Sequence, residues 1–98
     1  MIAVTDNDLK LVGIISMDDL RPILFDADAC ATSTISGLMK EPSTVISDFD
    51  TVISVVKKFD ETGAWNLPVV KISGEFVGFI SKSAVLNSYR QLLRSHSG

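Results

Sequence analysis

The sequence contains a ten-residue stretch that recurs 65 residues further along the chain. Residues 11–20 read LVGIISMDDL, and residues 76–85 read FVGFISKSAV. The alignment has no gap, so Gly13 corresponds to Gly78 and Ser16 to Ser81. At the same offset, residues 2–4 (IAV) fall on residues 67–69 (LPV). An internal repeat of this kind indicates two copies of one supersecondary unit.

Each copy has the pattern of a strand that ends at a serine and continues into a helix. Val12 and Ile14 are β-branched and favour a pleated strand. Ser16 can cap the following helix, and Asp18 and Asp19 lie in its first turn, where the helix dipole favours negative charge. This predicts a strand over 11–15 and a helix to about residue 25, burying Leu20, Ile23, Leu24 and Phe25.

The rest of the first copy is predicted to form a hairpin and a linker. A strand over residues 1–5 and a turn at residues 6–8 (DND) complete the hairpin. Pro22 lies past the first turn of the helix, which predicts a kink or a late helix start. Residues 26–33 (DADACATS) are small and polar and are expected to form the linker.

The second copy is predicted to be a complete β-α-β-β-α unit after a short helical turn at 34–39. Its elements are a strand at 44–47, a helix at 51–62, strands at 67–72 and 76–80, and a helix at 82–93. Asp48 or Asp50 would cap the first helix and Gly63 would end it, with Lys57 and Lys58 on a solvated face. The residues predicted to be buried in the two helices are Val52, Val55, Val56, Phe59, Val85, Leu86, Tyr89, Leu92 and Leu93, and residues 95–98 are expected to fray.

Composition limits the classes of protein to which the chain can belong. With 98 residues it has the size of one small domain, and its 46% apolar content suggests that part of the apolar surface lies in a subunit interface. A net charge of −3 without a basic run argues against nucleic acid and against an anionic membrane surface. No apolar run approaches the roughly 18 residues of a membrane span. Cys30 is the single cysteine, which fits a reducing, cytoplasmic compartment.

The repeated unit resembles the cystathionine-β-synthase (CBS) motif, which occurs in tandem pairs also called Bateman modules. The resemblance rests on the LPVV strand at 67–70 and on the GIISMDD turn at 13–19. It implies an α/β (α+β) fold of tandem β-α-β-β-α units with pseudo-two-fold symmetry. Residues 1–33 would be the C-terminal half of a first motif and a linker, and residues 34–98 a complete second motif. By the 65-residue offset, the missing strand and helix of the first motif would precede Met1.

A narrower resemblance is to the CBS pair of bacterial ClC-type chloride channels and transporters. It is carried by residues 12–21 (VGIISMDDLR), 64–70 (AWNLPVV) and 76–83 (FVGFISKS), and by Tyr89-Arg90. In that family the pair is a cytosolic tail behind a membrane domain. The resemblance implies a regulatory module of an ion-transport protein that pairs with a second copy and with the channel domain. The alternatives are a ligand-free structural dimerisation domain, or a CBS tail of another transporter or of an enzyme.

The CBS resemblance also implies an adenine-nucleotide site between the two motifs. Ser16 and Asp19 match the turn in which the aspartate holds the ribose hydroxyls, and a carboxylate has the acceptor oxygens for both. The implied base pocket consists of Thr44, Val45, Ile46, Trp65, Asn66, Leu67 and Pro68. The alternatives are a helix-terminal carboxylate without a ligand for Asp19 and a packing or interface residue for Trp65. Ala84 replaces the second aspartate, which predicts at most one ligand per chain.

Charge suggests which ligand the site would prefer. AMP, adenosine and ATP are the candidate ligands, and no cofactor is required. Because Asp18 adds negative charge to an acidic chain, ATP is expected to bind no better than AMP or adenosine. Lys40 and Lys71 are the cations that would change this expectation. No Cys/His or Ser/His/Asp set indicates an enzyme, and Cys30 and His96 lack metal partners at useful spacing.

Overall fold

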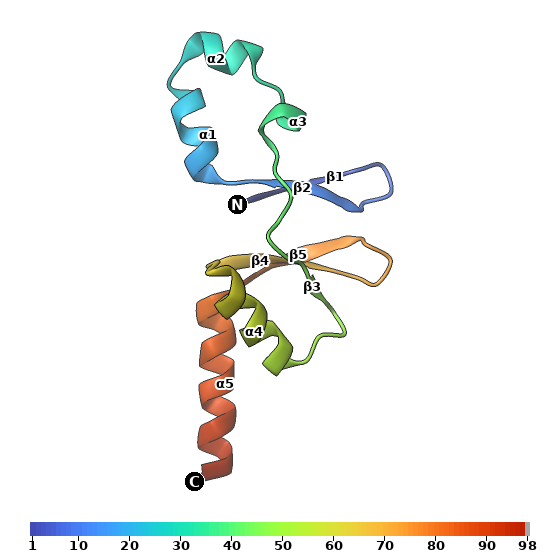
Figure 1. Cartoon of the computed structure of the whole chain (residues 1–98), viewed down its shortest axis with the longest axis vertical. Coiled ribbons are helices and arrows are strands. Elements are labelled where there is room, and N and C mark those ends of the chain that lie inside the picture. The colour runs from blue at the N-terminus through green and yellow to red at the C-terminus, as the bar shows by residue number, and fades with distance from the viewer. Residues whose placement is uncertain (98) are drawn as a thin grey trace.

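The chain folds into two units stacked along its longest axis (Figure 1). The computed structural model describes residues 1–97, and for Leu92 and residues 95–97 the backbone alone. It measures 59 × 30 × 18 Å and contains five helices and two sheets. Among the described residues, no helix combines the length and apolar character that crossing a bilayer requires.

The first unit is a hairpin followed by three short helices. Strands β1 (Ile2–Thr5) and β2 (Leu11–Ile15) pair antiparallel. The carboxylate of Asp6 accepts the backbone N–H groups of Asp8 and Lys10, which holds the turn. Helix α1 (Met17–Leu24) begins at Ser16, whose Oγ accepts the N–H of Asp19 at 3.1 Å. The predicted strand, turn and cap are confirmed.

The end of this helix and the linker differ from the prediction. Helix α1 contains no buried residue, and Leu24 and Phe25 are exposed, so their predicted burial is wrong. The helix starts at Met17 and continues through Pro22, so a late start is also wrong. Helix α2 (Ala27–Thr32) forms within the expected linker because Asp26 Oδ1 caps it and alanine favours helix.

The second unit is a three-stranded sheet with helices on one face. After α3 (Ile35–Leu38), the elements are β3 (Ile46–Ser47), α4 (Val52–Thr62), β4 (Asn66–Val70), β5 (Phe76–Ser81) and α5 (Lys82–Ser97). The strand order is β3-β4-β5, with β3 parallel and β5 antiparallel to β4. The complete β-α-β-β-α unit is therefore confirmed.

Several boundaries in the second unit correct the sequence prediction. Thr51 caps α4 in place of Asp48 or Asp50, because its Oγ1 accepts the N–H of Ser54. Gly63, at φ 68°, ends α4 as predicted. Strand β4 ends at Val70 and α5 extends to Ser97, where the sequence predicts a frayed tail. Gly98 and the predicted burial of Leu92 lie outside the described residues and side chains.

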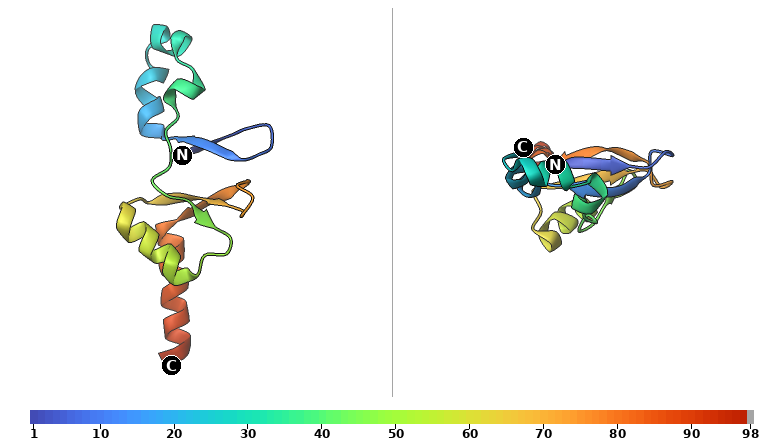
Figure 2. Two further views of the ribbon diagram at one scale, coloured as in Figure 1. Left: turned by 45° about the vertical axis from the view of Figure 1, so that its right-hand side comes forward. Right: turned by 90° about the horizontal axis from the view of Figure 1, so that it is seen from above.

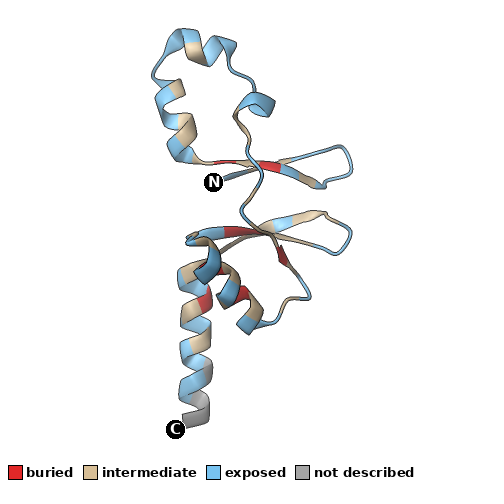
Figure 3. Ribbon diagram, viewed as in Figure 1, coloured by how far each residue is buried: buried red, intermediate tan, exposed pale blue. Residues whose placement is uncertain are grey.

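The hydrophobic core lies in the second unit, between its sheet and helices α4 and α5. Figure 3 shows buried segments on β3, β4, α4 and α5, and on β2 in the first unit. Val52 and Leu93 remain exposed, contrary to the prediction. The buried core residues are Ile46, Val55, Phe59, Leu67 and Val85, with Val56, Ala64, Val69 and Ile80 packed against them.

The two units are joined by backbone hydrogen bonds along the hairpins. Figure 2 shows the β1–β2 hairpin over the β4–β5 hairpin, and their tips are bridged between Lys10 and Glu75. At the other end, the N–H of Ile14 donates to the carbonyl of Lys40 and the N–H of Lys40 donates to the carbonyl of Ile14, at 2.9 and 2.8 Å. This second bridge brings Lys40 to the start of α1.

Glycines at equivalent repeat positions have different surroundings. At Gly13 a Cβ atom would lie 2.9 Å from Met39 Sδ, so the close approach there is made by Met39. At Gly78 a Cβ atom would have no neighbour within 4 Å, so no side chain packs closely on that position. The repeat in the sequence is therefore not a repeat in packing.

Candidate functional site

Ser16 and Asp19 come together at the N-terminus of α1. The Ser16 hydroxyl accepts the backbone N–H of Asp19 at 3.1 Å. The Nζ atom of Lys40 lies 3.1 Å from Asp19 Oδ2. The hydrogen bond from Lys40, followed by that from the Ser16 hydroxyl, lowers the pKa of Asp19 below its usual value. Asp19 is therefore an ionised acceptor at neutral pH, with a cation beside it.

The residues of the predicted base pocket lie in the second unit and differ in burial. Ile46, Leu67 and Pro68 are buried, the first two within the core cluster. Trp65 and Asn66, at the start of β4, are exposed. The side chains of Ile46 and Leu67 therefore belong to the hydrophobic core of the second unit.

Trp65 lies on the surface beside a cation. The Lys82 Nζ atom lies over the Trp65 ring, 5.4 Å from the ring centroid. The backbone N–H of Lys82 also donates to the backbone carbonyl of Trp65 at 2.8 Å. Trp65 is exposed, so its ring is not packed in the core of this chain.

Val45 and Thr44 are half-buried and precede β3. Val45 lines a cavity of about 350 Å³ between the two units. The other lining residues are Leu11, Val12, Glu41, Pro42, Val70 and Gly74. The segment from Lys40 to Ile46 thus runs from the Asp19 carboxylate, past this cavity, to the core.

Lys58 holds this segment in place, a role that the sequence analysis missed. Its Nζ atom donates to the Val45 carbonyl at 2.8 Å and to Asp50 Oδ2 at 2.7 Å. The side chains of Lys58 and Asp50 are only 27% and 20% exposed, so the predicted solvated face is wrong for Lys58. The i, i+4 series Asp50, Ser54, Lys58 is the signal that could have placed these groups on one stripe.

The stabilisation contributed by the Asp50–Lys58 pair depends on pH. Hydrogen bonds from Lys58, and then from the Ser47 backbone N–H, lower the pKa of Asp50. Because the folded-state pKa lies below the unfolded value, the pair stabilises the folded chain above the unfolded pKa. This contribution is lost as the pH falls through the folded-state pKa.

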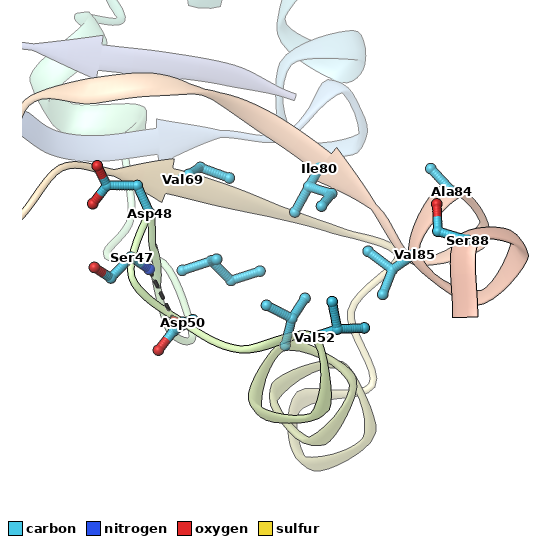
Figure 4. A pocket seen from close by; sticks show the side chains of 11 residues that line it. Ser47, Asp48, Asp50, Val52, Val69, Ile80, Ala84, Val85 and Ser88 are labelled. Carbon is cyan, nitrogen blue, oxygen red and sulfur yellow. Dashed lines mark hydrogen bonds between the residues drawn. The ribbon is translucent and has the colours of Figure 1, made fainter. Parts of the chain in front are cut away.

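The repeat-related position at α5 has the same cap but no carboxylate. Ser81 Oγ accepts the N–H of Ala84 at 3.2 Å, as Ser16 does for Asp19. Ala84 borders a second cavity, of about 370 Å³, which is lined by residues of the β3–β4–β5 sheet and of helices α4 and α5. Figure 4 shows Ser47, Asp48 and Asp50 at one end of this cavity and Ala84 and Ser88 at the other. An alanine offers no acceptor for ribose hydroxyls.

The described residues hold no group of three or more His, Cys, Asp or Glu side chains that could bind a metal ion. Lys71, the other cation considered from the sequence, pairs with Glu75 at 3.7 Å in the β4–β5 hairpin. Lys40 is therefore the lysine of these two that reaches the candidate site.

Comparisons with known proteins agree with this architecture. The model of the CBS domain family matches residues 35–91, more than half of the chain. A CBS domain-containing protein of Dictyostelium discoideum is 31% identical over 94 residues, covering 86% of this chain and 65% of its own length. The chain thus spans about two thirds of the length of this curated relative.

Two solved structures share the fold. The structure of CBSX2 in complex with AMP has a TM-score of 0.72 and 25% identity, covering 93% of this chain and 71% of that one. The soluble part of a magnesium transporter has a TM-score of 0.72 and 19% identity, covering 91% of this chain and 32% of that one.

Proposed function

Because this chain belongs to the CBS domain family, we propose that it is a cytoplasmic regulatory module that binds one adenine nucleotide between its two units. In this proposal residues 1–33 and 34–98 are the two motifs of the pair, and the first is incomplete. The module has no catalytic role and requires no cofactor. It changes the activity of the protein that carries it when the nucleotide binds.

The observation that carries the proposal is the ionised carboxylate of Asp19 at the start of α1. A carboxylate has two oxygens with about four lone-pair positions and accepts both hydroxyls of a ribose diol. Lys40 occupies one of these positions, through Oδ2. The AMP complex of CBSX2, which shares the fold, supports an adenine nucleotide as the ligand class. Thr44, Val45, Ile46, Trp65, Asn66, Leu67 and Pro68 are the proposed surroundings of the base.

Asp19→Ala is expected to weaken the binding of AMP and adenosine about 10- to 100-fold, because a charged acceptor for the ribose is lost. Calorimetric titration of wild type and variant with AMP, ADP, ATP and adenosine measures this. Asp18→Ala is the matched control, because Asp18 lies in the same turn but is almost fully exposed and pairs with Arg21. Its affinity is expected to stay within about threefold of wild type.

Two outcomes would contradict the nucleotide site. An equal loss of affinity in both variants would mean that charge in general, not Asp19, determines binding. Absence of binding to wild type at millimolar ligand would favour the alternative function, a structural dimerisation domain without a ligand.

We propose further that the parent protein is a ClC-type chloride channel or transporter, with this module as its cytosolic tail. The similarity of residues 12–21 and 64–70 to that family supports this host. A magnesium transporter is the alternative, since the soluble part of one shares the fold. The coding sequence upstream of Met1 tests whether the parent is a membrane protein or, in the other alternative, an enzyme. A channel would encode several apolar spans of about 20 residues each.

The module is also proposed to form a homodimer through the α4 and α5 surfaces. Val52 and Ile53 on α4 are exposed although both are apolar. Light scattering at high micromolar concentration is expected to give a dimer mass or larger, and Ile53→Asp is expected to lower it. Ile72→Asp, which changes another exposed isoleucine beyond the end of β4, is the control. A wild-type monomer under these conditions would contradict the dimer.

A further inference from the structure

We propose that Lys40 makes the Asp19 site selective for an adenosine that carries a 5′-phosphate, against adenosine itself and against adenosyl cations. The inference rests on the proposed function, because it assumes that the ribose binds at Asp19. The Asp19 carboxylate alone does not select the chemical class of the ligand, because it would bind the ribose whatever group the 5′ position carries.

The backbone fixes the position from which the Lys40 side chain starts. Two hydrogen bonds with Ile14 hold the Lys40 backbone against β2, one residue before the end of that strand. The preceding residue, Met39, packs so closely on Gly13 that the strand has no space for a Cβ atom there. The Lys40 backbone is thus held through its own N–H and carbonyl and by the packing of Met39, and its Nζ atom reaches Asp19 Oδ2 at 3.1 Å.

The outer end of the Lys40 side chain is free to meet a second anion. The side chain is 70% exposed, and the Asp19 side chain is 38% exposed. An ammonium group has three donors, so Lys40 can donate to Asp19 and to a phosphate oxygen together. The carboxylate in turn keeps acceptor positions for the ribose hydroxyls.

The other charged groups near the turn leave Lys40 as the cation that can offset the charge of a bound phosphate group. Asp18 and Asp19 are both acidic, and Arg21 lies beside Asp18 at 3.4 Å. Lys58 is held by Asp50 and Val45, and so is committed elsewhere. Without Lys40 a phosphate group would meet two carboxylates, with the N-terminus of α1 as its main compensation. One ammonium offsets part of the charge of a monophosphate and a smaller share of that of a triphosphate, so ATP is still expected to bind no better than AMP.

The test is a comparison of ligands that differ only in the charge at the 5′ position. AMP, adenosine and S-adenosylmethionine, whose 5′ sulfur is a sulfonium cation, are titrated at low ionic strength into wild type, Lys40→Met and Lys40→Arg. Lys71→Met is the matched control, because Lys71 also pairs with a partly exposed carboxylate but lies in the other hairpin. Thermal melting of each variant confirms that it is folded.

Lys40→Met is expected to weaken AMP binding about tenfold through loss of a charge-assisted contact. Adenosine is expected to stay within about twofold, and S-adenosylmethionine to bind equally or more tightly. Lys40→Arg and Lys71→Met are expected to bind AMP like wild type. The tenfold effect is expected to shrink as salt is added.

Three results would overturn the inference. If Lys40→Met leaves AMP binding unchanged, or weakens AMP and adenosine equally, Lys40 does not read the 5′ group, while the nucleotide site itself stands. If it tightens all three ligands, Lys40 competes with the ribose for Asp19. If wild type binds none of the ligands, both the inference and the proposed function fail.

Discussion

Replacing Phe59 by alanine is expected to lower the free energy of unfolding by about 3–5 kcal/mol. Phe59 is 1% exposed and lies in the core with Ile46, Leu67 and Val85, so its removal leaves a cavity that β4 and α5 fill only in part. For a domain with a total stability of about 5–15 kcal/mol, a loss of this size removes a large share. Urea denaturation followed by circular dichroism measures the difference.

Phe49→Ala is the matched control for this core substitution. Phe49 is 74% exposed and precedes α4, so the same change of side chain is expected to alter stability by less than about 0.5 kcal/mol. Similar losses in the two variants would mean that the core does not lie between the β3–β4–β5 sheet and helix α4.

Gly13→Val is expected to destabilise the chain by about 1–3 kcal/mol, because the new side chain overlaps Met39. Met39 cannot withdraw easily, since the next residue is bonded to Ile14 through both its N–H and its carbonyl. Thermal or urea unfolding of this variant, compared with wild type, measures the loss.

Gly78→Val is the control, because Gly78 occupies the equivalent repeat position in β5 but has open space at its Cβ position. Valine also favours strands over glycine, so this variant is expected to be at least as stable as wild type within about 0.5 kcal/mol. An equal loss in both variants would contradict the asymmetric packing of the two units.

Sequence reasoning was most successful where the determinants are local. The caps at Ser16 and Ser81, the end of α4 at Gly63 and the two hairpins all depend on neighbouring residues. The two caps also repeat at a fixed offset of 65 residues. The helical spacing of Val55 and Phe59 likewise identified the buried face of α4. These features need no knowledge of distant contacts.

The failures concern which surfaces meet. Leu24 and Phe25 follow a helical pattern but have no covering element among residues 1–97, so they stay exposed. Gly13 and Gly78 are equivalent in sequence, yet Met39 packs on only the first of them. Neither outcome could be read from residues near the position concerned.

The candidate site follows the same division. Ser16 and Asp19 were recognised from the turn itself, and the structure places them together. The contact of Lys40 with Asp19 depends on a backbone bridge between residues 26 positions apart, so the sequence could name Lys40 only as one of two lysines. The bond from Lys58 to the Val45 carbonyl likewise joins residues 13 positions apart and was not predicted.

The absence of buried residues in α1, α2 and α3 makes these helices a part of the described chain that opens at low cost. Amide hydrogens in α1 should therefore exchange with solvent through local opening, whereas those of β4 beside the core wait for global unfolding. A ligand that binds only when the first turn of α1 is formed raises the cost of this opening. At a ligand concentration 100 times Kd the increase is about 2.7 kcal/mol. Binding of the ligand at Asp19 would then slow local opening of α1, at one end of an elongated molecule.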